Sequence, residues 1–388
     1  MQERIERLKK RMKDGGIDAA FIMHPRSLYY YAGTSQPCNL VVTLKEEPLL
    51  YVRRAWDFVK KETPLENLKK GGSLGDISKY LESLGIREGV LGMEEDVLPA
   101  RLYNKTRDYF PSFQLKNISP LIMDQRLIKD QEERKLVEKA SSLFSHIHEV
   151  IMNNLKPGVK EVELAGLLWS KIRQEGHEGF TAHRRWDGFL PGDGIVASGE
   201  NLWQISGYAM TVTGTGKSKY IPWGSSDRVI QEGELVVVDV ATNYQGYHGD
   251  TARTYVAGKA SEKQREVYAS LSRVMEEILS HIREGVNVKD LYQLAEKAAE
   301  REGYQDYFQG YASQKGEYIG HGLGLEVDEP PVLGPQTDLE LKEGMILALE
   351  PKFIIPDWGA VDVEETLCVT REGCQVYGTV ERKLYEVY

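Results

Sequence analysis

Two pairs of acidic residues in the C-terminal half constrain the fold of this chain more than any other feature. Each pair flanks a short turn between runs rich in Val, Leu and Ile, and the four residues are Asp239, Asp250, Glu350 and Glu364. The turns, Asn243-Tyr244-Gln245-Gly246 and Pro356-Asp357-Trp358-Gly359, consist largely of residues that favour tight turns. The pattern predicts two β-hairpins that each carry two carboxylates near a hydrophobic interior.

Four converging carboxylates need compensating positive charge, because an unpaired buried carboxylate is strongly disfavoured. No run of Lys or Arg is placed to supply that charge, whereas two divalent cations would balance it. His321 adds an imidazole, and oxygen ligands with one imidazole suit Mn, Co, Fe or Zn. Any one of the acids could instead be a solvent-facing turn residue. Taken together, they favour a two-metal site with five ligands: Asp239, Asp250, His321, Glu350 and Glu364.

The same residues carry a resemblance to a known family. The matching runs are Gly246-Tyr247-His248-Gly249-Asp250, Gly320-His321-Gly322-Leu323-Gly324, Leu349-Glu350-Pro351 and Val363-Glu364-Glu365-Thr366. They are similar to the metal-ligand motifs of the pita-bread metallopeptidases, which include prolidase, aminopeptidase P, methionine aminopeptidase and creatinase. The resemblance implies that Asp239 binds one metal, that His321 and Glu350 bind the other, and that Asp250 and Glu364 bridge them. It also implies that Glu350 is the catalytic residue that shuttles protons.

The resemblance extends over nearly the whole chain and implies two domains. Residues 1–125 alternate helical and strand-like patterns and resemble the α/β creatinase-type N-terminal domain that precedes the catalytic domain of prolidases. Methionine aminopeptidase generally lacks such a domain. Residues 126–388 are expected to form the α+β pita-bread catalytic domain. Its predicted helices span residues 129–154, 160–176, 261–284 and 288–303.

Composition limits the partners and the compartment that we expect. The 388 residues carry a formal net charge of −10, which argues against a basic nucleic-acid surface. No run is long and apolar enough to span a bilayer. The N-terminus lacks a signal-peptide core and the chain has 3 cysteines, so we expect a cytoplasmic protein. The resemblance also implies that the protein forms a homodimer. Manganese is the metal that we expect first.

The sequence departs from the family pattern where the family binds substrate. Ile205-Ser206 stands where prolidases and aminopeptidases P have a Pro-His pair, and Asp328 stands where they have a second substrate-facing histidine. Asp362 occupies a position that is commonly Arg. The two missing imidazoles would hold the peptide carbonyl and stabilise a tetrahedral intermediate. The metal ligands are therefore retained while the groups around them are replaced.

Six residues are candidates for binding substrate in this altered cleft: His183, Arg184, Arg185, Ser206, His248 and Asp328. The basic run 183–185 precedes the Ile195 segment, where a loop could capture a substrate carboxylate. His248 is two residues from Asp250, so in a strand it would share the same face and support that ligand. The alternative for His248 and the basic run is an exposed or structural side chain.

Three classes of function follow. The first is a metallopeptidase, an exopeptidase that hydrolyses Xaa-Pro bonds of small peptides through a metal-bridging hydroxide, with Glu350 passing the proton to the leaving amine. The second is a creatinase-like C–N hydrolase or a lyase that acts on a small molecule at the same metal site, and the replaced histidines favour it. The third is a non-catalytic binding module, and retention of all five ligands counts against it.

Overall fold

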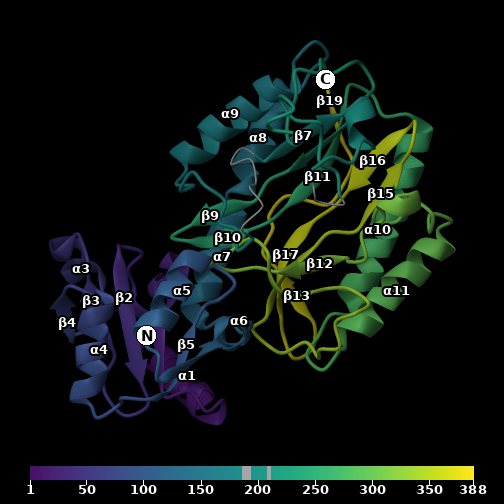
Figure 1. Ribbon diagram of the computed structural model, residues 1–388. Helices are drawn as coiled ribbons and strands as arrows, with labels where there is room; N and C mark the ends of the chain where they lie inside the picture. The colour runs from purple at the N-terminus through teal and green to yellow at the C-terminus, as the bar shows by residue number, and fades with distance from the viewer. Residues whose placement is uncertain (186–193, 208–210) are drawn as a thin grey trace. The chain divides into compact units, whose positions relative to one another are not determined.

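The computed structural model describes residues 1–185, 194–207 and 211–388. The chain divides into two compact units, Met1–Arg126 and Leu127–Tyr388, which are described separately (Figure 1). This division lies beside the predicted boundary between residues 125 and 126. Among the described helices, none combines the length and the apolar character that crossing a membrane requires.

The N-terminal unit is built on a mixed sheet with the strand order β4-β3-β2-β1-β5-β6 (Figure 1). Its strands are β1 (Ala19–Ile22), β2 (Cys38–Thr43), β3 (Leu49–Val52), β4 (Leu68–Lys70), β5 (Gly89–Met93) and β6 (Phe113–Asn117). Its helices are α1 (Gln2–Asp14), α2 (Pro25–Ala32), α3 (Trp56–Glu62), α4 (Leu74–Ser83), α5 (Ala100–Tyr109) and α6 (Ser119–Arg126). Phe21 of β1 shares one apolar core with Ile77 and Leu81 of α4. The interleaved helices and strands confirm the predicted α/β class.

The second unit contains five α-helices in its described part: α7 (Gln131–Ser142), α8 (Phe144–Asn154), α9 (Glu161–Gln174), α10 (Glu262–His281) and α11 (Val288–Arg301). Two short 3-10 helices, η1 (Gly199–Leu202) and η2 (Ala312–Gln314), accompany them. The single helix predicted over 129–154 is wrong, because the helix is divided at Leu143. The N–H of Leu143 donates to the Ala140 carbonyl and the N–H of His146 donates to the Leu143 carbonyl, so three-residue bonds interrupt the four-residue ladder.

Two sheets form the framework of this unit. One has the order β19-β11-β8-β7 and the other β13-β12-β14-β17-β18 (Figure 1). The first comprises β7 (Ile195–Ser198), β8 (Leu235–Asp239), β11 (Ala252–Ala257) and β19 (Tyr385–Val387). The second comprises β12 (Gly320–Gly322), β13 (Glu329–Val332), β14 (Ile346–Leu349), β17 (Glu365–Val369) and β18 (Cys374–Val376). Together with the helices they confirm the predicted α+β catalytic fold.

Both predicted acid-bearing hairpins are confirmed. β8 pairs with β11, with Asp239 opposite Ala252, and the ribbon continues as β9 (Thr242–Tyr244) and β10 (Tyr247–Gly249). β14 pairs with β17, and this ribbon continues as β15 (Lys352–Ile355) and β16 (Gly359–Asp362). Each of Asp250, Glu350 and Glu364 lies where a ribbon passes from one pair of strands to the next.

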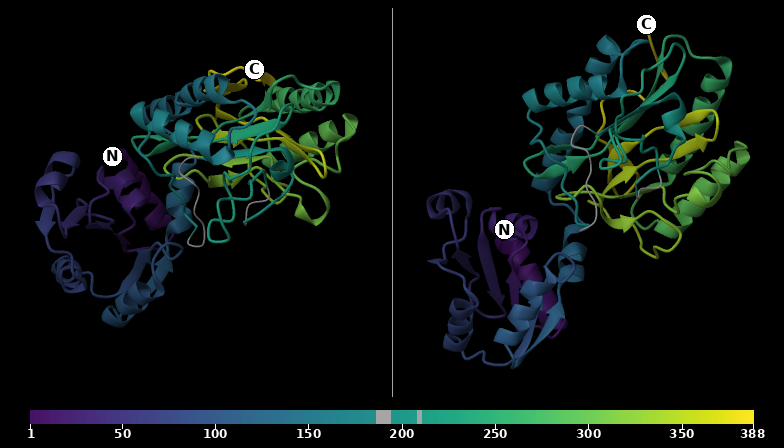
Figure 2. Two further views of the ribbon diagram at one scale, coloured as in Figure 1. Left: turned by 90° about the horizontal axis from the view of Figure 1, so that it is seen from above. Right: turned by 45° about the horizontal axis from the view of Figure 1, so that its top comes forward.

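Alternate side chains of β8 belong to two different cores. Val236 and Val238 share a core with α8 and α9, whereas Val237 joins the larger core that includes α10 and α11. The views in Figure 2 show these helices as two separate groups, teal and green, beside the strands. A strand that is apolar on both faces needs this cover on each side. Strand β8 is thereby fixed between two cores, and with it Asp239 at the end of the strand.

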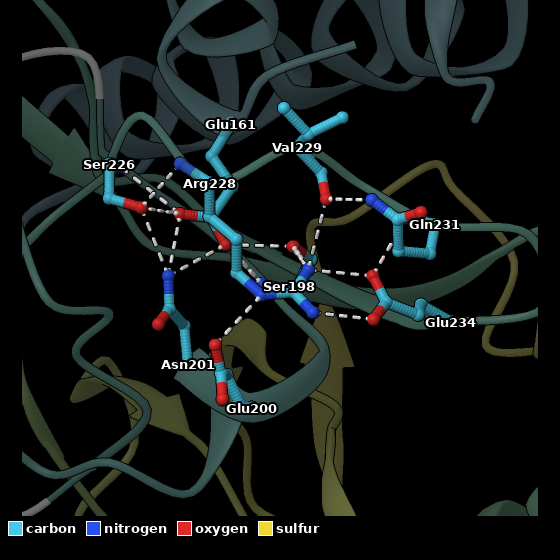
Figure 3. Close-up of polar contacts among 9 residues, drawn as sticks. All are labelled: Glu161, Ser198, Glu200, Asn201, Ser226, Arg228, Val229, Gln231 and Glu234. Atoms are coloured by element: carbon cyan, nitrogen blue, oxygen red, sulfur yellow. Dashed lines mark hydrogen bonds and ion pairs between the residues drawn. The ribbon is translucent and has the colours of Figure 1, made fainter. Parts of the chain in front are cut away.

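A buried polar network holds the beginning of α9 against β7 (Figure 3). Glu161 is fully buried and accepts hydrogen bonds from the N–H and hydroxyl of Ser198 at 2.7 and 2.8 Å. It also accepts from the N–H and hydroxyl of Ser226 at 3.1 and 2.6 Å and from the Asn201 amide at 3.0 Å. These donors supply the compensation that a buried carboxylate requires.

Glu161→Gln should lower the free energy of unfolding by about 1.5–3 kcal/mol, because the amide replaces one charged acceptor with a donor that faces other donors. Urea denaturation of wild type and variant measures the difference. Glu149→Gln on α8 is the matched control, since Glu149 is exposed, and it should change stability by less than about 0.5 kcal/mol. Equal stability of the Glu161 variant and wild type would contradict the role given to this network.

Candidate metal centre

A cleft of about 600 Å³ in the second unit contains the five predicted metal ligands. The structure brings to its wall Asp239, Asp250, His321, Glu350 and Glu364. Asp239 ends β8, and His321 lies in β12 between β13 and β14. The two ribbons and the His321 strand thus converge on one cavity.

Three of these residues form a compact set of donors. One ligand atom each of Asp250, His321 and Glu364 lies within 4.8 Å of the other two. Nε2 of His321 is also 3.5 Å from Oε1 of Glu350. Within the described part of the chain, Oδ1 of Asp250 is buried and has no hydrogen-bond partner. A cation fits this arrangement, because it would satisfy that oxygen and bind carboxylate and imidazole together.

The electrostatics of the cluster point the same way. Burial raises the pKa of Asp239 and of Glu364 well above the usual range, and the charge of Asp250 raises both further. Burial also raises the pKa of Asp250, to about 7, although His321 opposes the shift. Burial alone would lower the pKa of His321, but Asp328, Glu350 and Asp250 raise it to about 9. Without added cations, these acids therefore retain protons that divalent ions would displace.

The sequence analysis missed a buried cation beside the cluster. Nζ of Lys352 lies 2.6 Å from Oε2 of Glu350 and 3.2 Å from Oδ2 of Asp362, and the Lys352 side chain is 1% exposed. The sequence analysis considered only runs of Lys or Arg and did not identify this single lysine. A signal was available, because residues two apart in extended backbone share a face and Lys352 follows Glu350 by two.

Of the predicted substrate-binding residues, Arg185 and Asp328 are among the described residues that line the cleft. Asp328 is half-exposed, and its Oδ1 lies 3.4 Å from Nε2 of His321. Its other oxygen lies 3.7 Å from Nε2 of His183. Asp328 therefore links one predicted substrate residue, His183, to one predicted metal ligand.

The other three candidates make contacts within the protein. Nη1 of Arg184 lies 3.7 Å from Oε1 of the buried Glu326, and the Ser206 hydroxyl donates to the Pro222 carbonyl. His248 is buried; its Nε2 accepts from the N–H of Ala182 at 3.1 Å, and its Nδ1 lies 3.0 Å from the Gly324 carbonyl. Burial lowers the pKa of His248 to about 4, so this ring is a neutral connection between two loops. These contacts agree with the alternative that Arg184 and His248 are structural side chains. Ser206 is not among the described residues that line the cleft.

Comparison with known proteins places this geometry in a family. Residues 135–371 match the model of metallopeptidase family M24, and residues 4–128 match that of the creatinase/prolidase N-terminal domain. The chain is 30% identical to the Xaa-Pro dipeptidase of Pyrococcus furiosus over 390 residues, which cover 99% of this chain and 100% of that protein.

Two solved structures resemble the whole chain. The Xaa-Pro dipeptidase from Bacillus anthracis superposes with a TM-score of 0.84 at 26% identity and covers 99% of each chain. The prolidase from Pyrococcus horikoshii gives a TM-score of 0.81 at 27% identity, over 98% of this chain and 99% of that chain. The resemblance inferred from the sequence motifs is thus confirmed, and the chain belongs to metallopeptidase family M24, with a creatinase/prolidase N-terminal domain ahead of the catalytic domain.

Proposed function

We propose that this protein is a metal-dependent exopeptidase that hydrolyses Xaa-Pro bonds in dipeptides or short peptides. The observation that carries the proposal is the convergence of four carboxylates and one imidazole in a single cleft. Relatives that match this chain along its full length are named Xaa-Pro dipeptidases. The size of the cleft, about 600 Å³, suits a small ligand.

The five residues suit two divalent cations, with manganese as the first candidate and cobalt, iron or zinc as alternatives. In this assignment Asp239 would hold one ion, His321 and Glu350 would hold the other, and Asp250 and Glu364 would contribute to both. The unpartnered Oδ1 of Asp250 supports its role as a ligand. When bound, such ions lower the pKa of a shared water and polarise the substrate carbonyl.

The side chains around the ligands would bind the peptide and move its proton. The carboxylate of Glu350 lies beside His321 in the cleft, where it would accept the proton of the attacking water and pass it to the leaving amine. Asp328 and Arg185 carry opposite charges at the cleft wall, where they would hold the amino and carboxyl ends of a dipeptide. Trp223, Val327 and Pro330 add apolar surface for a proline ring.

A second candidate is C–N bond hydrolysis or elimination on a small molecule that is not a peptide. Ser206 and Asp328 favour it, because they stand where the family pattern has two substrate-facing histidines. The same metal ligands would serve this reaction. The two candidates differ in substrate, so one assay separates them.

The purified full chain, loaded with Mn²⁺, should hydrolyse Xaa-Pro dipeptides faster than the matched Xaa-Ala dipeptides. Tripeptides that begin Xaa-Pro distinguish a dipeptidase from an aminopeptidase. Chelation with EDTA should abolish the activity, and fresh Mn²⁺ should restore it. Protein shown by elemental analysis to hold metal, yet inactive on the whole panel, would favour the second candidate.

We also propose that the protein works as a homodimer in the cytoplasm. Free Cys38, Cys368 and Cys374 suit a reducing compartment. The dimer is inferred from the family resemblance alone.

A further inference from the structure

Lys352 is a buried cation enclosed by oxygen atoms. Its Nζ lies 2.6 Å from Oε2 of Glu350, 2.6 Å from Oγ1 of Thr211 and 3.2 Å from Oδ2 of Asp362. The ammonium is therefore a fixed positive charge at the edge of the candidate metal centre.

The hairpin β15–β16 places the partner of this charge. Lys352 and Asp362 are directly opposite each other in the pairing of the two strands, and Asp362 is fully buried. Glu350 precedes β15 and Glu364 follows β16, so the ion pair lies at the end of the hairpin that carries both ligands. Lys352 and Asp362 together add no net charge, which leaves the four acids of the cleft to be balanced by cations.

The two carboxylate oxygens of Glu350 have different neighbours. Oε2 accepts a hydrogen bond from Lys352, while Oε1 lies 3.5 Å from Nε2 of His321. Only one oxygen therefore faces the side where Asp250, His321 and Glu364 gather. A carboxylate whose second oxygen is held in this way cannot rotate freely or bind a cation through both oxygens.

We propose that Lys352 is a positioning residue for the metal centre: it holds Glu350 so that this carboxylate presents a single oxygen to a divalent cation. The proposal rests on the metal site of the proposed function, not on the identity of the substrate. Thr211, which also lines the cleft, accepts a hydrogen bond from the same ammonium.

The double variant Lys352→Met/Asp362→Asn tests the proposal, because it removes the ammonium from Glu350 without leaving Asp362 as a buried charge that has lost its partner. Isothermal titration of chelator-treated protein with Mn²⁺ should show about 10–100-fold weaker binding than wild type. The visible absorption of the Co²⁺-loaded variant should also change, since it reports the ligand geometry around the ion. Both readouts are independent of catalytic activity.

Asp362→Asn alone is the matched control, because it breaks the ion pair but keeps the ammonium on Glu350. It should bind Mn²⁺ within a few-fold of wild type and retain the wild-type Co²⁺ spectrum. If the methionine variant does not fold, Lys352→Gln/Asp362→Asn replaces it, because this variant keeps a neutral hydrogen-bonding pair. Its affinity for Mn²⁺ should also be about tenfold weaker than that of wild type. Thermal unfolding of each chelator-treated protein verifies that it is folded.

Wild-type affinity and an unchanged Co²⁺ spectrum in a folded double variant would overturn the positioning role. Equal losses in the double variant and in Asp362→Asn would overturn it as well, because the ion pair rather than the ammonium on Glu350 would then be responsible. Failure of the proposed function gives a different result: the wild-type protein binds the cation but cleaves no Xaa-Pro peptide. The comparison of affinities still decides the role of Lys352 in that case.

Discussion

Asp250→Asn should abolish metal-dependent activity and reduce turnover to that of the EDTA-treated wild type. The carboxylate of Asp250 is one of three compact donors, and its Oδ1 is buried without a hydrogen-bond partner in the described structure. The amide that replaces it carries no charge and binds a divalent cation weakly. Turnover of an Xaa-Pro dipeptide with saturating Mn²⁺ measures the loss, and elemental analysis measures the metal retained.

The same substitution should act on stability in opposite directions with and without metal. In chelator-treated protein above pH 7, where Asp250 is ionised, Asp250→Asn removes a buried charge, so the melting temperature should rise. In wild type, Mn²⁺ at about 100 times its Kd should add about 2.7 kcal/mol to the free energy of unfolding, whereas a variant that cannot bind gains nothing. Thermal denaturation of both proteins with and without Mn²⁺ tests whether the effect of the substitution on the melting temperature changes sign.

The pH dependence of the metal-free protein offers an independent check. Burial raises the pKa of Asp250 from 3.8 to about 7, so between these values the folded protein holds a proton that the unfolded chain releases. The stability from this group is complete below pH 4 and is lost as the pH rises towards 7. Asp250→Asn should therefore reduce the decline in stability with rising pH.

Glu317→Gln is the control for all three measurements. Glu317 is exposed and lines the same cleft, so its replacement removes a cleft carboxylate outside the donor set. This variant should retain the metal-induced stabilisation of wild type. A similar rise in melting temperature with Mn²⁺ in Asp250→Asn and Glu317→Gln would show that Asp250 is not a metal ligand.

The acid-bearing hairpins could be predicted because their determinants are local. Turn residues, β-branched runs and the acids of each hairpin all lie within one continuous segment, 235–257 or 346–369, and the strands pair as these signals predict. The convergence of the two hairpins on one cleft was also expected, from the cost of burying Asp239, Asp250, Glu350 and Glu364 without cations. The electrostatic cost of burying the acids therefore predicted that two segments far apart in the sequence meet in the fold.

Contacts that depend on tertiary packing could not be predicted in the same way. Lys352 follows a proposed ligand, yet only the pairing of β15 with β16 places it opposite Asp362. Arg184 was a candidate for binding substrate or for a structural role, and the structure places it 3.7 Å from Glu326, a residue far along the chain. The two pairings, Lys352 with Asp362 and Arg184 with Glu326, depend on how distant segments pack, so both required the folded structure.

Arg253→Met should destabilise the protein by about 3–5 kcal/mol, because it breaks a buried ion pair and leaves a buried carboxylate without its main partner. Arg253 is completely buried, and its Nη2 donates to Oε1 of Glu365 at 2.6 Å. Its Nη1 donates to the carbonyl of Glu364 at 2.7 Å, and its Nη2 also donates to the carbonyl of Val380. Arg253 thereby ties the first ribbon to the segment that carries a predicted ligand of the second. Urea denaturation measures the cost in the metal-free protein.

Arg382→Met is the matched control, since Arg382 contacts the same carboxylate oxygen of Glu365 at 3.3 Å but is 26% exposed and also pairs with Glu276 at the surface. Solvent screens that pair, so its loss should cost about 1 kcal/mol or less. If the position of Glu364 depends on Arg253, the Arg253 variant should also bind Mn²⁺ more weakly under conditions where it remains folded, whereas Arg382→Met should not. Equal costs for the two arginines would contradict the view that Arg253 joins the two ribbons, because the shared contact with Glu365 would then account for both effects.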